Sequence, residues 1–566
     1  MPEPMMSERV EFECNGDPIE VDVEPGESLL SVLRERLRLT SVKDGCAPQG
    51  QCGCCTVFVD DGARVACVTP ATRVRGRRVT TLEGLDAERR DAIADAFLAH
   101  GASQCGFCTP GIVMRCAALL DDGRAGERAA VGNALAAHLC RCTGWLGIVD
   151  ALTELADDAR SGPRPARDLD AASERAGIEG GALQRVSREV VLGEGGFADD
   201  GAVRAARDRD MLVGVPAGDH DAVAASLFEA RVSAAKVQGR RTSFALAPPI
   251  APPAPEPGGV ALATSWVEPA YLEPDAAWCA PGAEPASPLA NGGAFGGQES
   301  SPVGRQAAAL ANEHGSAARV LWSREDVVRL GPKRPPMSAR AYCDGDRVLI
   351  SGRGPAALVV PPSPYGIEVG VRWDTIDVVG PRVSTAMRAP FAEAAVLVEG
   401  ALDAAGFERA AAVDGLAAAV LLDTCVGDPG GGLAGARVEF DASTGALARV
   451  HVRVAGGRLL DEVVVRSYCT GAVHMALGWV LREGIAVDAD GVVHDLTIRS
   501  FGILRAKDMP PVTIEVLDDA RAPCRVSDAV FAATAAACWN ALARAEGSRP
   551  DTFPARDTRA AQLLRR

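Results

Sequence analysis

The N-terminal part of the chain changes from strand-like to helix-like patterning of its apolar residues. Apolar and polar positions alternate from Val10 to Cys14 and from Ile19 to Val23, around the turn-forming pair Asn15-Gly16. This arrangement predicts a β-hairpin. After Pro25-Gly26, the apolar residues of Glu27 to Leu37 share one helical face, which predicts a helix. A glycine- and cysteine-rich loop and another strand follow.

Helical patterning continues farther along the chain. Residues 91–100, 112–120 and 129–139 have apolar residues at helical spacing. Two pairs of cysteines lie beside these helices: Cys105 and Cys108 before the second, and Cys140 and Cys142 after the third. Because both pairs lie at helix ends, they can meet around one metal centre. Cys116 follows the apolar pattern within a helix and is predicted to lie in the core.

The middle of the chain has a weaker pattern. Residues 157–181 are polar and rich in proline, glycine and alanine, which predicts a linker. Residues 182–245 are compatible with a small α/β unit. Residues 248–257 hold six prolines and predict an extended spacer.

Composition narrows the classes of function. With 566 residues, the chain is expected to hold about three to five domains. Its formal net charge of −16 disfavours nucleic acid and anionic membranes as partners. No basic start with an apolar run marks a secretory signal, and no apolar stretch approaches the ~18 residues of a spanning helix. These features predict a cytoplasmic protein.

Cysteine is the residue that points to chemistry. The chain has 17 cysteines, and eleven of them lie at or before Cys142. In a reducing compartment, clustered cysteines are typical of metal ligands. For the first group we assign four thiolates of a 2Fe–2S cluster, with Cys54 as a further candidate and a zinc site as the alternative for both groups. The four assigned ligands are Cys46, Cys52, Cys55 and Cys67.

Four segments carry a family resemblance. GCAPQGQCGCCTV, ACVTP, SQCGFCTPGIV and LCRCTGW resemble the iron–sulfur part of the xanthine dehydrogenase/aldehyde oxidase family of molybdenum hydroxylases, over about residues 8–155. The resemblance implies a plant-type ferredoxin domain for the first cluster and a four-helix domain for the second. It also implies that Gln104 and Cys142 lie near the pterin of a molybdenum cofactor. The second cluster is then held by Cys105, Cys108, Cys140 and Cys142.

A second series of segments resembles the molybdopterin-binding part of the same family. It begins near Val260 and includes NGGAFGGQES, STAMRAPFAEA and GAVHMALGWVLREGI. The resemblance implies that the glycine-rich loop approaches the metal and substrate, and that Arg388 faces the substrate. The implied cofactor-binding residues of the loop are Gly293, Ala294, Phe295 and Gly296.

This chain departs from the family at three places. Between Leu422 and Val438, the family's glycine-rich cofactor loop with its Gln is replaced by DTCVGDPGGGLAGAR. Ser467-Tyr468 stands where the family has Gly-Gln. Ser527-Asp528 stands where the family has Gly and a Glu that is the general base. Asp528 is therefore expected to be either a shorter general base or a helix N-cap.

The sequence thus predicts an α+β multidomain protein. The expected domains are a β-grasp ferredoxin domain (1–84), a helical 2Fe–2S domain (85–158), a linker with a small α/β region (159–258) and a shortened α/β molybdopterin-binding domain (259–566). No FAD domain is expected, so electrons would pass to an external acceptor or flavoprotein.

Two functions remain open at this point. One is hydroxylation of an aldehyde or N-heterocycle, and the other is a non-catalytic electron-transfer or assembly subunit. The chain could form a homodimer or a heteromer.

Overall fold

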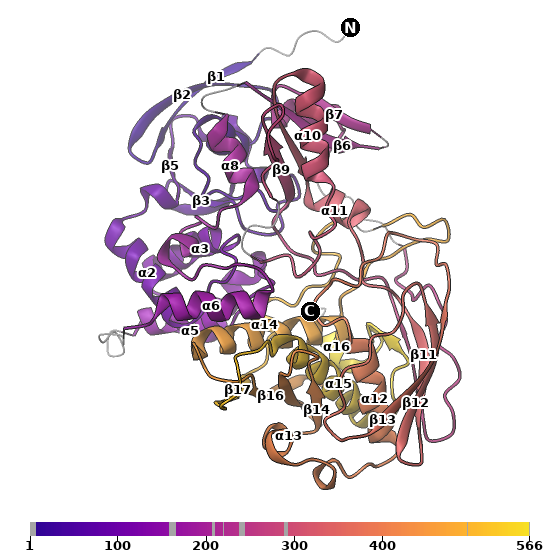
Figure 1. Cartoon of the computed structure of the whole chain (residues 1–566). Coiled ribbons are helices and arrows are strands. Elements are labelled where there is room, and N and C mark those ends of the chain that lie inside the picture. The colour runs from indigo at the N-terminus through magenta and orange to yellow at the C-terminus, as the bar shows by residue number, and fades with distance from the viewer. Residues whose placement is uncertain are drawn as a thin grey trace.

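The structure of the chain is a computed structural model. It describes residues 7–157, 166–206, 210–218, 220–236, 244–287, 292–494 and 496–564. In Figure 1 the N-terminal strands lie at one end of the molecule and the C-terminal sheets at the other, with helices between them. None of the helices in these ranges is long and apolar enough to cross a membrane.

The N-terminal domain is a five-stranded sheet in the order β2-β1-β5-β3-β4. The predicted hairpin is present, and Asn15 and Gly16 form its turn with φ angles of 54° and 92°. Ser28 caps the helix that follows, and its side chain accepts a hydrogen bond from the Ser31 backbone. This is the β-grasp arrangement predicted from the sequence. Its elements are β1 (Glu8–Cys14), β2 (Asp17–Val23), α1 (Leu29–Ser31) with a π-helical turn (Val32–Arg36), β3 (Thr56–Val59), β4 (Gly62–Val65) and β5 (Arg78–Thr80).

Four helices make up the next domain, as predicted. Cys108 is the N-cap residue of α3, and Cys140 and Cys142 lie in the loop before α5. Cys116 is fully buried in α3, which confirms its place in the core. The helices are α2 (Ala87–Ala99), α3 (Thr109–Asp121), α4 (Arg128–Ala134) and α5 (Leu146–Leu155).

The prediction of a linker over residues 157–181 is wrong for the part that the structure describes. Residues Leu169–Gly180 form a helix, α6, which Asp168 caps at its start and the left-handed Gly181 ends. Ala172 and Ala176 of α6 pack against the long helix α14 (Glu462–Leu481). Figure 1 shows α6 lying beside α14. The apolar face of α6 consists largely of alanines, so the segment has the composition of a linker.

The predicted small α/β unit is not separate from the C-terminal part. Strand β6 pairs in parallel with β10, so one sheet, β7-β6-β10-β9, crosses the expected boundary at residue 258. The proline-rich residues 248–257 contain no helix or strand, as predicted. The elements are α7 (Arg188–Val191), α8 (Ala198–Ala205), β6 (Met211–Ala217), β7 (His220–Ala224), α9 (Leu227–Ser233), β9 (Asp275–Cys279), α10 (Val303–His314), β10 (Ala317–Trp322) and α11 (Arg324–Leu330).

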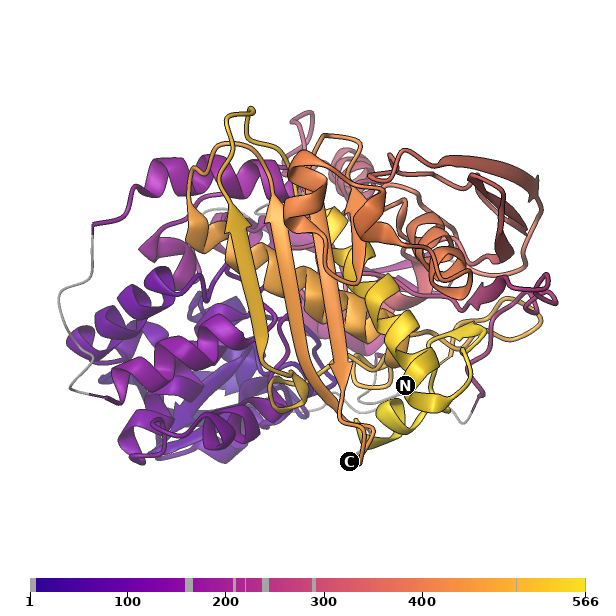
Figure 2. The same cartoon turned by 90° about the horizontal axis from the view of Figure 1, so that it is seen from below.

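Two more sheets form the C-terminal half, in the orders β13-β12-β11-β8-β18 and β14-β15-β16-β17. Figure 2 shows the second of these sheets lying across α14 and α15. The remaining elements are β8 (Val260–Thr264), β11 (Ser338–Asp344), β12 (Arg347–Gly354), β13 (Glu368–Thr375), α12 (Ala392–Ala404), α13 (Gly415–Val420), β14 (Thr424–Gly427), β15 (Leu433–Phe440), β16 (Leu447–Ala455), β17 (Val512–Leu517), α15 (Ser527–Glu546), β18 (Thr552–Phe553) and α16 (Arg559–Leu563).

The buried apolar residues show how these parts are joined. The helical domain and the C-terminal half share one continuous hydrophobic core, whereas the ferredoxin domain has a core of its own. The segment that replaces the family's cofactor loop is the tight hairpin between β14 and β15. This hairpin leaves no long loop at that position.

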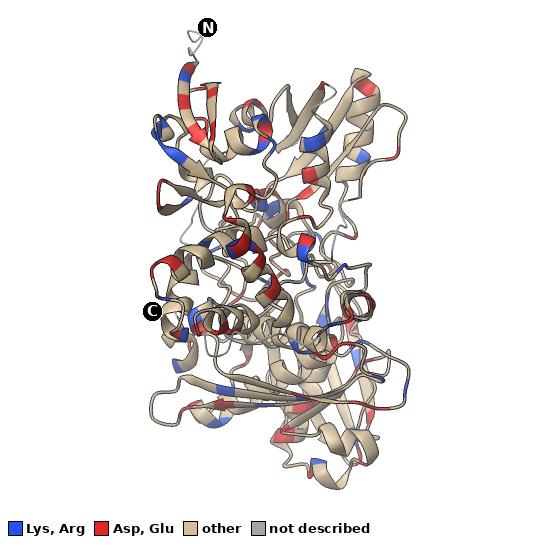
Figure 3. Ribbon diagram, turned by 90° about the vertical axis from the view of Figure 1, so that its left-hand side faces the viewer, with Lys and Arg blue, Asp and Glu red and all other residues tan. Residues whose placement is uncertain are grey.

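Buried ion pairs hold the ferredoxin domain in place. Acidic and basic residues lie near one another along much of the ribbon in Figure 3. Inside the molecule, Arg34 donates to Asp199 at 2.7 Å and to Asp200 at 2.9 Å, and both carboxylates belong to α8. Arg319 of β10 also contacts Asp199. The N-terminal domain is therefore fixed against the middle sheet.

Candidate functional site

The first cysteine group lies in the loop before β3 and just after β4. The thiol of Cys46 is within hydrogen-bonding reach of Cys52 and Cys67, and these contacts lower the pKa of Cys46 well below its usual value. The thiol of Cys67 also contacts Cys55. Backbone N–H groups of Gln51 and Cys52 donate to the Cys46 sulfur at 3.2 and 3.3 Å. Such donors stabilise thiolate sulfur in an iron–sulfur site.

Cys54 is a fifth thiol in this region. It is within hydrogen-bonding reach of Cys52 and packs in the core shared with the helical domain, whereas Cys55 packs in the ferredoxin core. The two residues lie in the turn just before β3, and their side chains enter different cores. The backbone N–H of Cys67 donates to the Cys55 sulfur at 3.4 Å, which favours Cys55 as the ligand.

We predict different results for substitution of the two adjacent cysteines. Cys55→Ser should remove the first cluster, because a thiolate in contact with Cys67 is lost. Cys54→Ser should leave both clusters in place. Electron paramagnetic resonance of the dithionite-reduced proteins measures the two signals separately. A first-cluster signal that survives in Cys55→Ser and disappears in Cys54→Ser would reverse the assignment.

The second cysteine group is also brought together from two loops. The sulfur atoms of Cys105 and Cys142 lie 3.6 Å apart, and Cys108 contacts Cys140. Hydrogen bonding from Cys108 lowers the pKa of Cys140 to about 6. The close sulfur contacts raise the pKa of Cys108 and of Cys142 well above the usual value. Within the described residues, no three His, Cys, Asp or Glu side chains gather as for a single metal ion, and the thiols of this second group contact one another in two pairs.

One backbone hydrogen bond links the two cysteine groups. The N–H of Leu139 donates to the carbonyl oxygen of Cys52 at 2.9 Å. Cys52 belongs to the first group, and the residue after Leu139 is Cys140 of the second group. A short path of covalent bonds and one hydrogen bond therefore connects the two groups.

Beyond the second group lies the loop with the predicted cofactor-binding residues. A Cβ atom placed on Gly293 would lie 2.7 Å from the Cys105 sulfur, so the glycine backbone lies directly on that thiol. Ala294 is buried in a small core and anchors the loop. Phe295 has a φ angle of 52°, and its carbonyl oxygen accepts a hydrogen bond from the Arg388 backbone at 3.1 Å. Gly296 lies close against the Ala386 carbonyl. Asn291 lies outside the described residues.

Arg388 and Asp528 lie next to each other in the structure. Arg388 Nε lies 3.3 Å from an Asp528 oxygen, and the guanidinium carbon lies 5.1 Å from the centre of the Phe295 ring. The Arg388 side chain is 7% exposed, and its Nη1 and Nη2 atoms have no partner among the described residues. A cavity of about 40 Å³ lies beside Phe295 and Arg388, which is room for about one water molecule.

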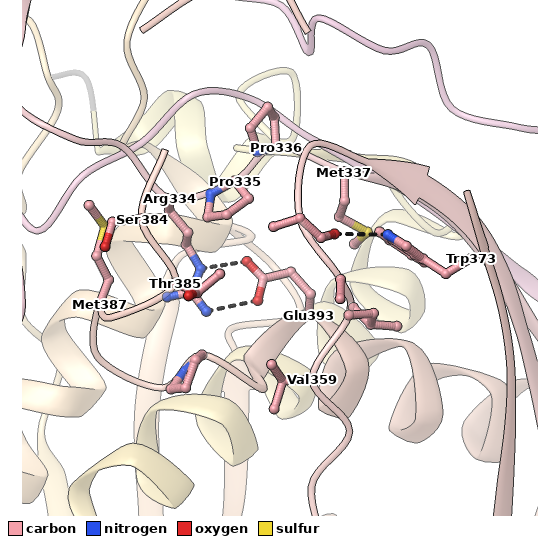
Figure 4. A pocket seen from close by; sticks show the side chains of 14 residues that line it. Arg334, Pro335, Pro336, Met337, Val359, Trp373, Ser384, Thr385, Met387 and Glu393 are labelled. Atoms are coloured by element: carbon pink, nitrogen blue, oxygen red, sulfur yellow. Dashed lines mark hydrogen bonds and ion pairs between the residues drawn. The ribbon is translucent and has the colours of Figure 1, made fainter. Parts of the chain in front are cut away.

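A second arginine holds the Arg388 loop. Arg334 donates to the Arg388 carbonyl oxygen at 2.8 Å and also to the carbonyl oxygen of Ala389. Its guanidinium pairs with Glu393 of α12, as the dashed lines in Figure 4 show. Glu393 therefore fixes the position of Arg334, and Arg334 fixes the backbone of Arg388, which lines the cavity.

The helix-cap interpretation of Asp528 is wrong. Helix α15 begins at Ser527, its N-cap residue is Val526, and no side chain of α15 caps it. Glu179 of α6 caps it instead, because its carboxylate accepts from the Ser527 N–H at 3.0 Å. Asp528 lies in the first helical turn, between Arg388 and Arg525.

Family models match three parts of the chain. A 2Fe-2S iron-sulfur cluster binding domain matches residues 12–78, a [2Fe-2S] binding domain matches residues 81–153, and a molybdopterin cofactor-binding domain matches residues 375–510. The xanthine dehydrogenase iron-sulfur-binding subunit of Escherichia coli O157:H7 is 39% identical over 153 residues, which are 25% of this chain and 95% of that protein. The chain belongs to the xanthine dehydrogenase/aldehyde oxidase family of molybdenum hydroxylases. Family membership identifies the chain as an oxidoreductase with two 2Fe–2S-binding domains and a molybdopterin cofactor-binding domain.

Other members of the xanthine dehydrogenase/aldehyde oxidase family match different shares of the chain. The nicotine 6-hydroxylase small subunit of Paenarthrobacter nicotinovorans is 39% identical over 27% of this chain and 94% of that protein. The aldehyde oxidoreductase of Megalodesulfovibrio gigas is 38% identical over 39% of this chain, but the match covers only 24% of that protein. The crystal structure of the Desulfovibrio desulfuricans aldehyde oxidoreductase aligns with 98% of this chain and 99% of that chain, at a TM-score of 0.72 and 16% identity, which shows a shared fold.

The residues expected at the pterin are engaged with one another in this family member. The Gln104 amide donates to the Ser467 hydroxyl at 2.9 Å and to the Cys142 carbonyl at 2.8 Å. The Tyr468 hydroxyl donates to Gln184, a buried residue that sequence reasoning missed. The Gln104, Ser467 and Tyr468 side chains are thus hydrogen-bonded within the protein. The family's Gly-Gln pair is replaced by two side chains that bond within the protein.

Proposed function

We propose that this chain is an electron-transfer component of a molybdenum hydroxylase-type oxidoreductase. Two 2Fe–2S clusters, each a one-electron carrier, would be held by the two cysteine groups. The residues of the chain orient the thiolates, supply backbone N–H donors to their sulfurs and keep the two groups adjacent.

The observation that carries this proposal is the hydrogen bond of 2.9 Å between Leu139 and Cys52. It connects both ligand groups through a few bonds, in a chain where all eight expected ligands are buried. The internal hydrogen bonds of Gln104 and Tyr468 further support electron transfer rather than hydroxylation within this chain.

Metal content tests the proposed function. Purified without oxygen from a host that makes molybdopterin, the protein should contain about four irons and four acid-labile sulfides per chain, the amount for two clusters. Molybdenum and pterin should be absent, and both clusters should be reduced and reoxidised by small electron carriers. Stoichiometric zinc without visible absorption would contradict the iron–sulfur assignment.

Arg388 favours a second candidate, hydroxylation of an aldehyde or N-heterocycle in the C-terminal half. Arg388 lines the same cavity as Phe295, and its two unpartnered Nη atoms could bind an anionic or carbonyl group. Stoichiometric molybdenum in the purified protein would favour this candidate.

If hydroxylation occurs, Asp528 is the expected general base. Asp528→Ala should then lower turnover by roughly 10²–10⁴-fold, with both clusters retained. Asp528→Glu should keep or raise turnover, because it restores the reach of the family's Glu. Steady-state turnover and iron content are measured together. Equal turnover in the Ala variant and the parent protein would remove Asp528 from the chemistry.

A further inference from the structure

A cavity of about 240 Å³ lies between the first cysteine group and helix α9. Cys67, a predicted cluster ligand, lines it together with Ala47 and Pro48, which follow the ligand Cys46. Leu227 and Phe228 of α9 line the side contributed by the middle domain. A molecule in this cavity would contact the protein directly beside the first cluster.

Charged side chains in the cavity wall are already neutralised. Arg34 pairs with Asp199 and Asp200, Arg231 pairs with Asp44 at 2.8 Å, and Lys236 pairs with Asp326. Glu35 pairs with Arg319 at 2.8 Å. Because each cation faces a carboxylate, the wall does not favour a ligand with a full negative charge.

Two arginines of the lining each keep one buried N–H without a partner among the described residues. These groups are Nε of Arg34, whose side chain is 2% exposed, and Nη2 of Arg231. Burying such donors without an acceptor is unfavourable. The rest of the lining is largely apolar and includes Leu30, Pro48 and Phe228. An uncharged planar ligand with carbonyl oxygens fits both the unpartnered N–H groups and the apolar lining.

We propose that this cavity binds a neutral quinone as the electron acceptor of the chain. The cavity is somewhat smaller than the roughly 300–1,000 Å³ of drug-sized ligand sites, so one or two fused rings are the expected size. Reduction of a quinone to its hydroquinone takes two electrons and two protons. The two clusters supply one electron each, and water supplies the protons. This inference rests on the proposed electron-transfer function.

Direct binding is the first test. Isothermal titration calorimetry of the oxidised holoprotein with a soluble naphthoquinone should show one site per chain. Arg231→Lys keeps a cation beside Asp44 but loses the free N–H, and Phe228→Ala removes the aromatic wall. Each substitution should weaken naphthoquinone binding by roughly 3- to 10-fold, which is the loss of affinity expected when one hydrogen bond or one ring contact is removed. Arg77→Lys is the matched control, because Arg77 lies in the same domain, pairs with Asp60 and does not line the cavity.

Reoxidation kinetics is the second test. The dithionite-reduced protein, freed of excess reductant, is mixed with the naphthoquinone or with ferricyanide, which need not enter a cavity. The rate of cluster reoxidation should saturate as the naphthoquinone concentration rises, and it should change in both cavity variants. The rate of reoxidation by ferricyanide should be the same in all of these proteins. A rate that rises linearly with quinone and is equal in all variants, or calorimetry without a site, would overturn the quinone site. Clusters that neither acceptor reoxidises would instead refute the proposed electron-transfer function.

Discussion

Gly471→Ala should destabilise the protein by about 3 kcal/mol or more, although alanine is the better helix former. Gly471 lies within α14, where a Cβ atom would stand 1.8 Å from the carbonyl oxygen of Cys142. Helix propensity alone favours alanine by about 1 kcal/mol. Overpacking costs typically 1–3 kcal/mol and occasionally more, and here the atom in the way is backbone, which cannot rotate aside. The steric cost therefore outweighs the gain in propensity.

Denaturant unfolding of the holoprotein measures this change. The second-cluster signal in electron paramagnetic resonance should also shift or broaden, because Cys142 is displaced with its carbonyl. Gly177→Ala in α6 is the matched control, since the nearest atom to its Cβ is at 3.5 Å. It should be neutral or stabilising by up to about 1 kcal/mol. Similar stabilisation in both variants would show that α14 does not lie against the Cys142 loop.

Local sequence patterns predicted the N-terminal half because its determinants are close together in the chain. The Asn15-Gly16 turn and the helices beside the cysteine pairs each depend on residues a few positions apart. The assignment of ligands among Cys54 and Cys55 was harder, because both lie beside the first group and differ only in the side to which they point.

The C-terminal site depends on contacts that no local pattern contains. Asp528 satisfied the sequence rule for a helix cap, but Glu179, 348 positions before Ser527, provides the cap. Gln184, which bonds to Tyr468, lies 284 positions away from it. The family resemblance placed Gln104, Phe295 and Arg388 at one site, but it could not show that residues near α6 contact the same region.

Arg141 was also missed, although it stands between two predicted ligands, and its removal should have a large effect. Its guanidinium binds both oxygens of Glu483 at 2.7 and 2.8 Å and the Pro269 carbonyl at 2.8 Å. Both side chains of the ion pair are 2% exposed. Burial raises the pKa of Glu483, and Arg141 opposes this rise. The pair joins the second-cluster loop to the end of α14.

Arg141→Met should therefore cost about 3–5 kcal/mol, because it leaves a buried carboxylate without its partner. In this variant the folded-state pKa of Glu483 rises further above its unfolded value. The folded protein then binds a proton that the unfolded chain releases, so stability is greatest below the unfolded pKa and falls as the pH rises toward the folded pKa. Denaturant unfolding of the holoprotein at several pH values measures this slope.

The double variant Arg141→Met/Glu483→Leu should regain most of the loss and the slope should disappear, since no buried charge remains. Arg128→Met, which breaks a surface pair with Asp150, is the control and should cost at most about 1 kcal/mol. Equal losses at Arg128 and Arg141, without pH dependence, would mean that the Arg141–Glu483 pair is not buried. A double variant as unstable as Arg141→Met would instead assign the loss to Arg141's bond with Pro269, and the second-cluster loop would then depend on that single backbone contact.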